Sequence, residues 1–124
     1  MKNPNMTNKE RGLLKGAARR VFSRSELRRA ALELSKINFS DPNRPRVKKW
    51  SRCPECNKNT PTYKMEVDHI SPVIFYDQTL EDMSWDLLID RIWCNIDNLR
   101  AICSDCHKIK TSNERKLRKK RTKK

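Results

Sequence analysis

The cysteines have the most informative spacing in the sequence. Five occur, and four of them form two C-x-x-C pairs, Cys53 with Cys56 and Cys103 with Cys106, separated by a long segment. Two such pairs supply four thiolates, the donor set that structural Zn²⁺ prefers in tetrahedral sites. A redox C-x-x-C motif would need only one pair, in a βαβ context. The sequence therefore predicts one structural zinc ion bound by the four paired cysteines.

Both histidines of the chain lie beside residue types that bind metals or move protons. His69 follows Asp68 at the end of an expected strand, and His107 follows Cys106 at the start of an expected helix. Adjacent helix positions point about 100° apart, so Cys106 can face zinc while His107 faces a separate site. The alternative is that Asp68 caps a turn and His69 packs in a core, which leaves His107 and the charge pattern unexplained.

The charge of the chain is large and unevenly distributed. Lys and Arg number 29 against 15 Asp and Glu, a net charge of +14 with a pI near 10.0. The net charge is +11 over residues 1–52, −5 over residues 53–102 and +8 over residues 103–124. Such a surplus indicates a polyanionic partner, in the first place nucleic acid. The acidic centre would repel DNA unless some carboxylates held a cation, which is a first indication of a metal-dependent site. The other interpretations of the charge are an anionic membrane surface and a merely soluble basic protein.

The composition limits the size of any core and excludes a membrane helix. Only 35% of the 124 residues are hydrophobic, against roughly 45–50% in ordinary soluble domains, and the mean hydropathy is −0.95. We therefore expect one small domain with segments outside its core. The apolar runs are too short to cross a bilayer, and the N-terminal MKNPNMTNKERG lacks the apolar region of a secretory signal. We expect a cytoplasmic protein without disulfides and with no membrane partner.

Short strands and helices are expected to position the cysteines and histidines. The central elements are a strand over 63–70, a loop over 75–84, a helix over 85–93 capped by Ser84, a turn over 95–98, a strand over 99–102 and a helix from about Ser104. The apolar stripe of the central helix, Trp85, Leu88, Ile89 and Ile92, is typical of a core face. Cys94 follows this helix and is expected to be a small core residue.

The two ends of the chain are expected to be basic. Apolar residues in 9–21 recur at helical spacing, and Ser23 with Glu26 matches a capping box for a second helix to about Ile37. This predicts a helical hairpin with a cationic outer face, either solvated or in contact with DNA. The C-terminal residues are expected to form a disordered or fraying basic arm. The expected division is 1–45 as a basic helical extension, 46–112 as the central domain and 113–124 as a basic tail.

Three spaced motifs together resemble the HNH endonuclease family. Residues 67–73 read VDHISPV and residues 98–111 read NLRAICSDCHKIKT, similar to the family's D-H-I-x-P strand, N-L-x-x-L-C stretch and C-H-x-x-K-T helix. The bracketing C-x-x-C pairs are similar to its zinc-containing branch. The segment WDLLIDRIWC, residues 85–94, is similar to a helix of small phage-encoded members. The resemblance covers roughly residues 50–111.

The resemblance implies an α+β fold with a ββα-metal (His-Me finger) core, and hydrolysis of phosphodiester bonds in DNA. It implies that His69 is the general base that activates water, and that Asp68 and His107 bind a catalytic divalent cation. Mg²⁺ or Mn²⁺ is expected there, with Ni²⁺ as an alternative. Asn98 matches the middle residue of the motif and would fix the loop or orient His69. Because the insertion before it is long, Asn95 is a rival for that role.

Three functions remain open from the sequence. The leading one is an HNH endonuclease that nicks or cuts double-stranded DNA, in a bacterial host cytoplasm if the chain is phage-encoded. The second is a non-catalytic, zinc-stabilised nucleic-acid-binding protein. The third is a packaging or repair accessory that acts with a phage protein partner. The residues expected to contact DNA are Arg19, Arg20, Arg28, Arg29, Lys108 and Lys110.

Overall fold

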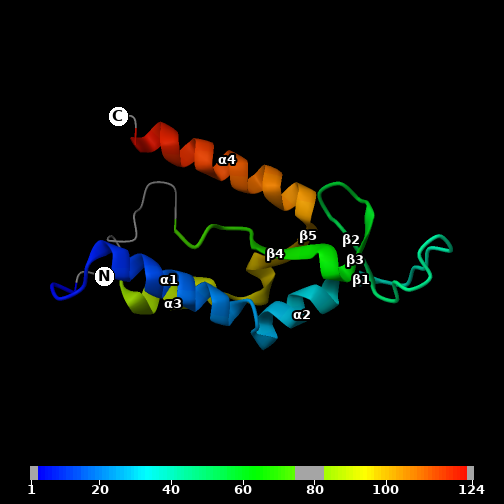
Figure 1. Cartoon of the computed structure of the whole chain (residues 1–124), viewed down its shortest axis with the longest axis horizontal. Coiled ribbons are helices and arrows are strands. Elements are labelled where there is room, and N and C mark those ends of the chain that lie inside the picture. The colour runs from blue at the N-terminus through cyan, green and yellow to red at the C-terminus, as the bar shows by residue number, and fades with distance from the viewer. Residues whose placement is uncertain (1–2, 75–82, 123–124) are drawn as a thin grey trace.

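The computed structural model describes residues 3–74 and 83–122 and has a mixed α+β fold (Figure 1). The helices and strands in this part of the chain are α1 (Asn8–Phe22), α2 (Glu26–Ser35), β1 (Lys36–Ile37), β2 (Trp50–Arg52), β3 (Asn59–Pro61), β4 (Met65–His69), α3 (Trp85–Ile92), β5 (Leu99–Cys103) and α4 (Ser104–Thr122). Short 3₁₀ turns at Thr62–Lys64 and Ile96–Asn98 lead into β4 and β5. The loop expected over 75–84 lies mostly outside the described residues.

The described strands form two small antiparallel sheets, β1-β2-β3 and β4-β5. In the second sheet Met65 pairs with Cys103 at one end, and His69 pairs with Leu99 at the other. A strand rises about 3.3 Å per residue, so the four residue steps from Met65 to His69 separate the two ends by about 13 Å. The register therefore places one cysteine pair and the first histidine at opposite ends of the same strand pair.

Helices cover the β4-β5 sheet on two sides. Helix α4 follows β5 directly and packs on both strands, and α2 packs on the same strands (Figure 1). Helix α1 packs against α3 instead of folding back on α2, so the expected helical hairpin is wrong. The two N-terminal helices follow one another along the molecule, each on a different part of it (Figure 1).

The buried apolar side chains form two clusters. The larger contains Phe22 of α1, Leu88 and Ile92 of α3, and Leu99 of β5. Cys94, predicted to be a buried core residue, packs against this cluster but is only half-buried. The smaller one surrounds the cysteines; its buried members are Cys53, Met65, Ala101, Ile102 and Cys103. A core this small is consistent with the hydrophilic composition, and it leaves the fold dependent on other sources of stability.

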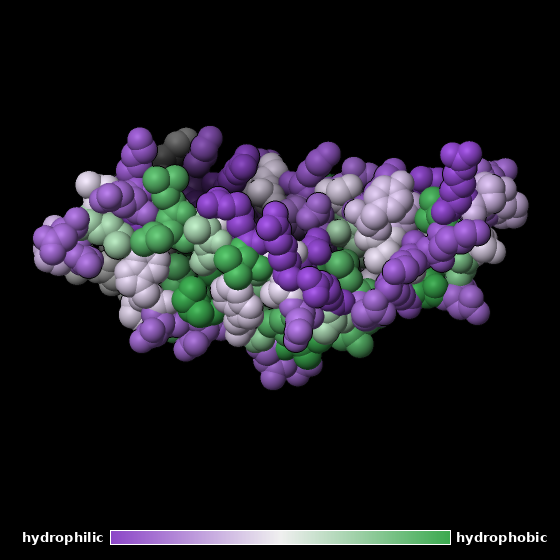
Figure 2. All heavy atoms as spheres, turned by 60° about the horizontal axis from the view of Figure 1, so that its bottom comes forward, coloured by the Kyte–Doolittle hydropathy of each residue, from purple (hydrophilic) through white to green (hydrophobic). Residues whose placement is uncertain are grey.

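Helix α1 matches its expected range, but its buried face differs from the expected one. Thr7 and Glu10 form the capping box at its start. Leu13 and Val21, two of the apolar residues whose spacing predicted this helix, are 61% and 62% exposed, whereas Phe22 is buried. Ala18 and Phe22 pack in the larger cluster, whereas Leu13 and Val21 belong to neither cluster. Figure 2, with the lower side of Figure 1 turned forward, shows apolar side chains reaching the surface among hydrophilic ones.

The start and end of α2 also differ from the prediction. The cap is Ser25, whose hydroxyl accepts a hydrogen bond from the Arg28 backbone N–H at 3.2 Å. The Ser23 hydroxyl donates instead to the Arg20 carbonyl within the end of α1, at 2.6 Å. The helix ends at Ser35 because the next two residues become extended and pair with β2.

The C-terminal segment is helical over most of its length. Helix α4 runs unbroken across position 112 to Thr122, so the expectation of a disordered or fraying arm is wrong for residues 113–122. Glu114 and Arg118 in this part of the helix contact Lys110 and the Ile74 carbonyl. The Arg118 contact connects the second half of α4 to the segment after β4, whereas the Glu114 contact lies within the helix. Whether residues 1–45, 46–112 and 113–124 behave as separate units stays a prediction.

Candidate functional site

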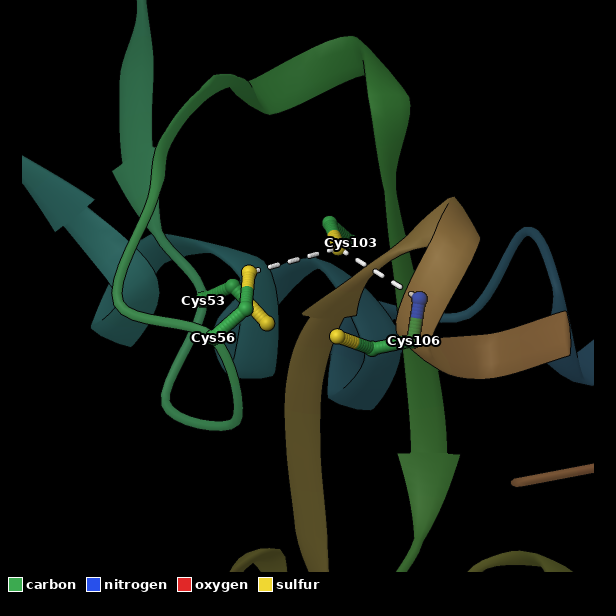
Figure 3. Close-up of side chains that lie close together, drawn as sticks. All are labelled: Cys53, Cys56, Cys103 and Cys106. Carbon is green, nitrogen blue, oxygen red and sulfur yellow. Dashed lines mark hydrogen bonds between the residues drawn. The ribbon is translucent and has the colours of Figure 1, made fainter. Parts of the chain in front are cut away.

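The two C-x-x-C pairs converge on one cluster, as the sequence predicted (Figure 3). The sulfur atoms of Cys53, Cys56, Cys103 and Cys106 all lie within 4.8 Å of one another. The Sγ atoms of Cys56 and Cys103 are 3.8 Å apart, and about 3.8 Å is the edge of a sulfur tetrahedron around zinc with Zn–S bonds of about 2.3 Å. Two of the cysteines are buried and two are half-buried. The donor set and its spacing therefore fit a structural zinc ion.

Tight local turns bring each cysteine pair together. In the first pair the Asn57 N–H donates to the Cys53 carbonyl at 2.8 Å, and Asn57 has a left-handed backbone with φ of 60°. Asn tolerates that region better than most residues. The second pair spans the junction of β5 and α4, where the Cys106 N–H donates to the Cys103 sulfur at 3.5 Å.

The thiols of the cluster differ in acidity. Burial opposes ionisation of Cys53, but hydrogen bonds from backbone N–H groups outweigh it and lower its pKa to about 7. The pKa of Cys106 is raised, first because it shares a hydrogen bond with the sulfur of Cys103. Burial is the main cause of the raised pKa of Cys103. Cys53 is thus more acidic than these two and more readily supplies a thiolate.

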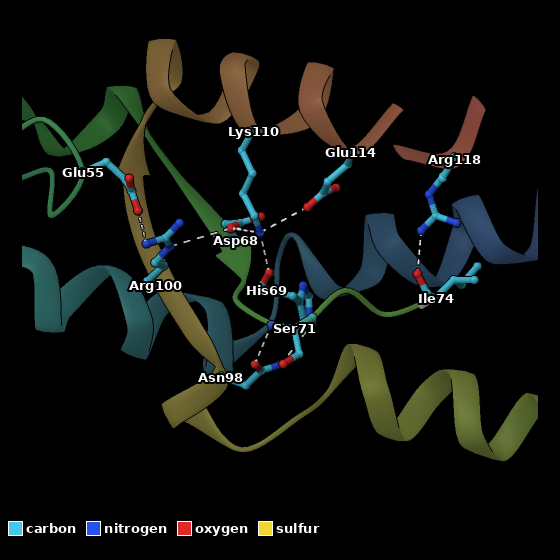
Figure 4. A network of polar contacts seen from close by, with 10 residues as sticks. All are labelled: Glu55, Asp68, His69, Ser71, Ile74, Asn98, Arg100, Lys110, Glu114 and Arg118. Carbon is cyan, nitrogen blue, oxygen red and sulfur yellow. Dashed lines mark hydrogen bonds and ion pairs between the residues drawn. The ribbon is translucent and has the colours of Figure 1, made fainter. Parts of the chain in front are cut away.

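A second site lies at the other end of the β4-β5 sheet. A pocket of about 120 Å³ is lined by Asp68 and His69 of β4, His107 of α4 and Arg19 of α1, among others. The sequence singled out all four of these residues, and the fold brings them to one pocket from three elements. The polar contacts around it are drawn in Figure 4.

His69 is held in one orientation by a backbone carbonyl. Its Nε2 lies 2.8 Å from the Ile92 carbonyl oxygen. A carbonyl only accepts hydrogen bonds, so Nε2 carries the proton and Nδ1 keeps its lone pair in the neutral ring. Burial, with a smaller contribution from the nearby Arg19, lowers the pKa of His69, and the Ile92 contact opposes that shift. The ring of Phe22 packs on it, with centroids 5.3 Å apart.

The Asp68 carboxylate is paired with cations from two elements. Lys110 of α4 contacts Asp68 Oδ2, and Arg100 of β5 approaches the same oxygen at 3.9 Å. Lys110 also donates to the His69 carbonyl at 2.7 Å and lies 3.3 Å from a Glu114 oxygen (Figure 4). Lys110, which the sequence analysis expected to contact DNA, thus has its ammonium group engaged inside the site.

Asn98 fixes the backbone after His69. Its side-chain oxygen accepts from the Ser71 N–H at 2.9 Å, and its carbonyl accepts from the Ile70 N–H at 2.8 Å. Asn95, the rival for this role, instead accepts from the Asp97 N–H and caps the turn before β5. The geometry therefore favours Asn98 as the residue that positions the loop.

The metal-ligating side chains differ between the two sites. Within residues 3–74 and 83–122, the four cysteines form the one group of three or more such side chains close enough to share an ion. Asp68 and His107 line the same pocket but supply only two donor groups. A cation there would complete its coordination with water or substrate oxygens, as Mg²⁺ commonly does.

Sequence analysis missed two residues of the pocket, Glu114 and Arg118. Both lie in the segment expected to be a disordered or fraying arm. Their spacing from Lys110, four and eight residues, would have indicated one helix face shared with that lysine. The other expected DNA contacts lie outside the pocket: Arg20, Arg29 and Lys108 are exposed and Arg28 is half-buried.

Comparison with known proteins returns no relatives. No family model, no curated protein and no solved structure matches the chain. In the part of the chain that the structure describes, none of the helices has the length and apolar character needed to span a bilayer.

Proposed function

We propose that the protein is a metal-dependent endonuclease of the HNH type that hydrolyses phosphodiester bonds in DNA. In this proposal β4, β5 and α4 are the ββα-metal core. The observation that carries it is the small pocket that Asp68, His69 and His107 share with Arg19 and Arg118. Hydrolysis of a phosphodiester requires a base for water, compensation of the charge on the leaving oxygen and cations for the phosphate.

His69 is the proposed general base. Its lone pair is on Nδ1, since Nε2 donates to the Ile92 carbonyl. Burial keeps the ring neutral at neutral pH by lowering its pKa, so it can accept a proton from a water molecule that attacks phosphorus. Asn98 accepts a hydrogen bond from the backbone of the loop that follows His69 and so helps to hold His69 Nδ1 in a fixed position.

Asp68 and His107 are the proposed ligands of the catalytic cation. A carboxylate and an imidazole suit Mn²⁺ or Ni²⁺, and Mg²⁺ through the carboxylate and water. Both cationic contacts to Asp68 fall on Oδ2, which leaves Oδ1 as a donor. When bound, the cation acts as a Lewis acid that stabilises charge on the phosphate and the leaving oxygen. Arg19 and Arg118 are suited to orient the phosphate.

The four-cysteine cluster is proposed to hold Zn²⁺ for structural purposes. All four positions are filled by protein sulfurs, and a closed Cys₄ site offers no open position for substrate. The zinc would fix the Cys106 turn at the start of α4 and so orient the helix that carries His107. This separates a stabilising metal from a catalytic one within a short chain.

Cleavage of supercoiled plasmid DNA tests the proposal. Protein that retains its zinc should convert plasmid to nicked or linear product when Mg²⁺ or Mn²⁺ is added, and not when the added cation is omitted. Omission of the cation is preferable to a strong chelator, because a chelator would also remove zinc and unfold the chain. Products with 5′-phosphate ends would identify hydrolysis at the leaving 3′ oxygen.

A second function is a zinc-stabilised DNA-binding protein that does not cut. The observation in its favour is that Lys110 already neutralises the Asp68 carboxylate, which lowers the need for a cation there. The same plasmid experiment separates the two functions. Retarded migration of the plasmid with intact strands, at every tested Mg²⁺ and Mn²⁺ concentration, would favour the binding protein.

A further inference from the structure

We propose that a groove beside α2 is a second DNA-binding surface, which takes an unpaired strand rather than a duplex. The groove has a volume of about 760 Å³ and lies between α2, the segment 46–49 before β2, and the turn that begins at Thr62. These elements lie at the end of the molecule that carries β1 to β3 (Figure 1). The catalytic pocket lies elsewhere, between α1, β4 and α4. The inference rests on the proposed function only for the choice of DNA as the polyanion.

Basic residues outnumber acidic ones in the lining of the groove, although most of its exposed surface is formed by apolar atoms. The lining includes five basic side chains and one acidic one: Arg29, Lys36, Arg46, Lys48, Lys49 and Glu33. The single carboxylate, Glu33, is paired with Lys36. Arg46 and Lys48 make no ion pair with any described residue. A concave surface with this charge concentrates phosphate groups, and the field is stronger than that of the same cations on a convex face.

An exposed aromatic ring stands at the edge of these cations. Tyr63 lines the groove and is 70% exposed. Its hydroxyl accepts a hydrogen bond from Arg44 at 3.1 Å, and the Lys64 ammonium lies 5.9 Å from the ring centroid. Cations that follow a phosphate backbone, with an aromatic ring on which a base stacks, are the features by which proteins hold single strands.

Hydrogen bonds connect the walls of the groove. The Ser35 hydroxyl donates to the Ser51 hydroxyl at 2.9 Å, and the Ser51 and Thr62 hydroxyl oxygens are 2.8 Å apart. These two successive hydrogen bonds connect α2, β2 and the turn that begins at Thr62. The Thr62 N–H donates to the Lys49 carbonyl at 3.0 Å. A site formed in advance loses less conformational entropy when it binds a ligand.

The ring and the volume together favour an unpaired nucleotide. A volume of 760 Å³ lies within the range of about 300–1,000 Å³ typical of pockets that enclose small ligands, and so has room for a nucleotide with its phosphate. In a duplex the bases are stacked on each other and offer no free face to Tyr63. An acidic peptide would satisfy the cations but would leave the exposed ring without a partner.

A fluorescence-anisotropy experiment tests the inference. It measures binding of a fluorescein-labelled 12-nucleotide single strand to the full-length His69→Ala protein without added Mg²⁺. Tyr63→Ala should weaken binding roughly 5–100-fold through lost stacking, with little change in salt dependence. Tyr63→Phe should bind like the parent protein. Arg46→Gln combined with Lys48→Gln should reduce the slope of log K against log salt by about 1.4, or about 0.7 per phosphate contact.

A matched double variant elsewhere controls for the loss of charge. Lys9→Gln with Lys58→Gln also removes two positive charges, from exposed positions outside the groove. It should change the slope of log K against log salt less than Arg46→Gln with Lys48→Gln does. All variants should keep the zinc content and melting temperature of the parent. The inference is overturned if Tyr63→Ala binds as the parent does, or if polyglutamate competes as well as the oligonucleotide. Plasmid cleavage at saturating protein is scored separately, so failure of the groove and failure of the nuclease proposal give different results.

Discussion

At the scale of single residues, two neighbours set the chemistry of His69. The Ile92 carbonyl fixes which nitrogen carries the proton, and burial lowers the pKa of the ring below its ordinary value of 6.5. As the proposed general base, His69 must be neutral to act, so the rate of the chemical step should rise with pH and level off once the ring has lost its proton. Single-turnover plasmid cleavage from pH 5 to 8 should have its acid half-point below 6.5 and be flat around neutrality. A half-point well above 6.5 would exclude His69 in this environment as the base.

Lys110 should stabilise the fold as well as the site. Its ammonium bridges Asp68, the His69 carbonyl and Glu114, and the side chains of Lys110 and Asp68 are 22% and 12% exposed. Lys110→Met keeps the length but leaves Asp68 with only the distant Arg100. We expect a loss of roughly 1–3 kcal/mol in the free energy of unfolding, measured by urea denaturation. Lys110→Arg should recover part of it, and a Lys110→Met protein as stable as the parent would show that the bridge contributes nothing.

The residues of the candidate site could be predicted only where spacing was informative. Three residues, Asp68, His69 and His107, could be predicted because their types and neighbours suit metal binding and proton transfer. All three line the same pocket. The partner of Lys110 could not be predicted, since Asp68 is 42 residues away and only the pairing of β4 with β5 and α4 brings the two together. Glu114 and Arg118 were missed because a run of Lys and Arg was interpreted as a solvated arm.

At the scale of elements, periodicity predicted where α1 and α3 lie but not all of their buried faces, since Leu13, Val21 and Ile89 are exposed. The shortest strands could not be predicted. Helix α3 has a capping serine and an apolar stripe, and its cap bond from the Leu87 N–H to the Ser84 hydroxyl is present at 3.1 Å. The strands β1, β2 and β3 have two or three residues each, too few for an alternating pattern. For α4, the Lys, Arg and Glu that suggested disorder are also good helix formers, and contacts with the segment after β4 stabilise the helix.

The core face of α3 provides a prediction with a matched control in the same helix. Ile92 is fully buried in the larger cluster, whereas Ile89, three residues earlier, is 40% exposed. Ile92→Ala should cost about 2–5 kcal/mol of unfolding free energy, and Ile89→Ala clearly less. Urea denaturation of both proteins measures the difference. Equal losses would mean that α3 does not present the face that the structure assigns to it.

At the scale of the whole molecule, a zinc ion in the four-cysteine cluster would compensate for a small core. The two C-x-x-C pairs are 47 residues apart from Cys56 to Cys103, so a zinc ion would close a long loop around β3 to β5. Removal of zinc, or Cys106→Ser, should abolish the cooperative fold. Cys94→Ala, outside the cluster, should keep both zinc and fold. Zinc content by elemental analysis and far-ultraviolet circular dichroism measure this, and a folded wild-type chain without zinc would contradict it.

The overall charge pattern agrees with two binding regions on one chain. The acidic centre supplies Asp68 for the proposed catalytic pocket, and α1 and α4 contribute Arg19 and Arg118 to its lining. The basic segment before β2 lines the separate groove. The groove would bind single-stranded DNA, and the pocket around His69 would bind the phosphodiester to be cut. DNA binding and cleavage would then use different parts of the molecule.

The most direct test of the account is single-turnover cleavage of plasmid by the His69→Ala protein with Mg²⁺ or Mn²⁺. His69→Gln serves as a second variant that keeps more of the packing against Phe22. Both should retain zinc, DNA binding and a cooperative melt, and both should cut roughly 10²–10⁴-fold more slowly than the wild-type protein, the usual contribution of a general base. A well-folded His69→Ala protein that cleaves within a few-fold of the wild-type rate would contradict the nuclease mechanism and favour the non-catalytic DNA-binding function.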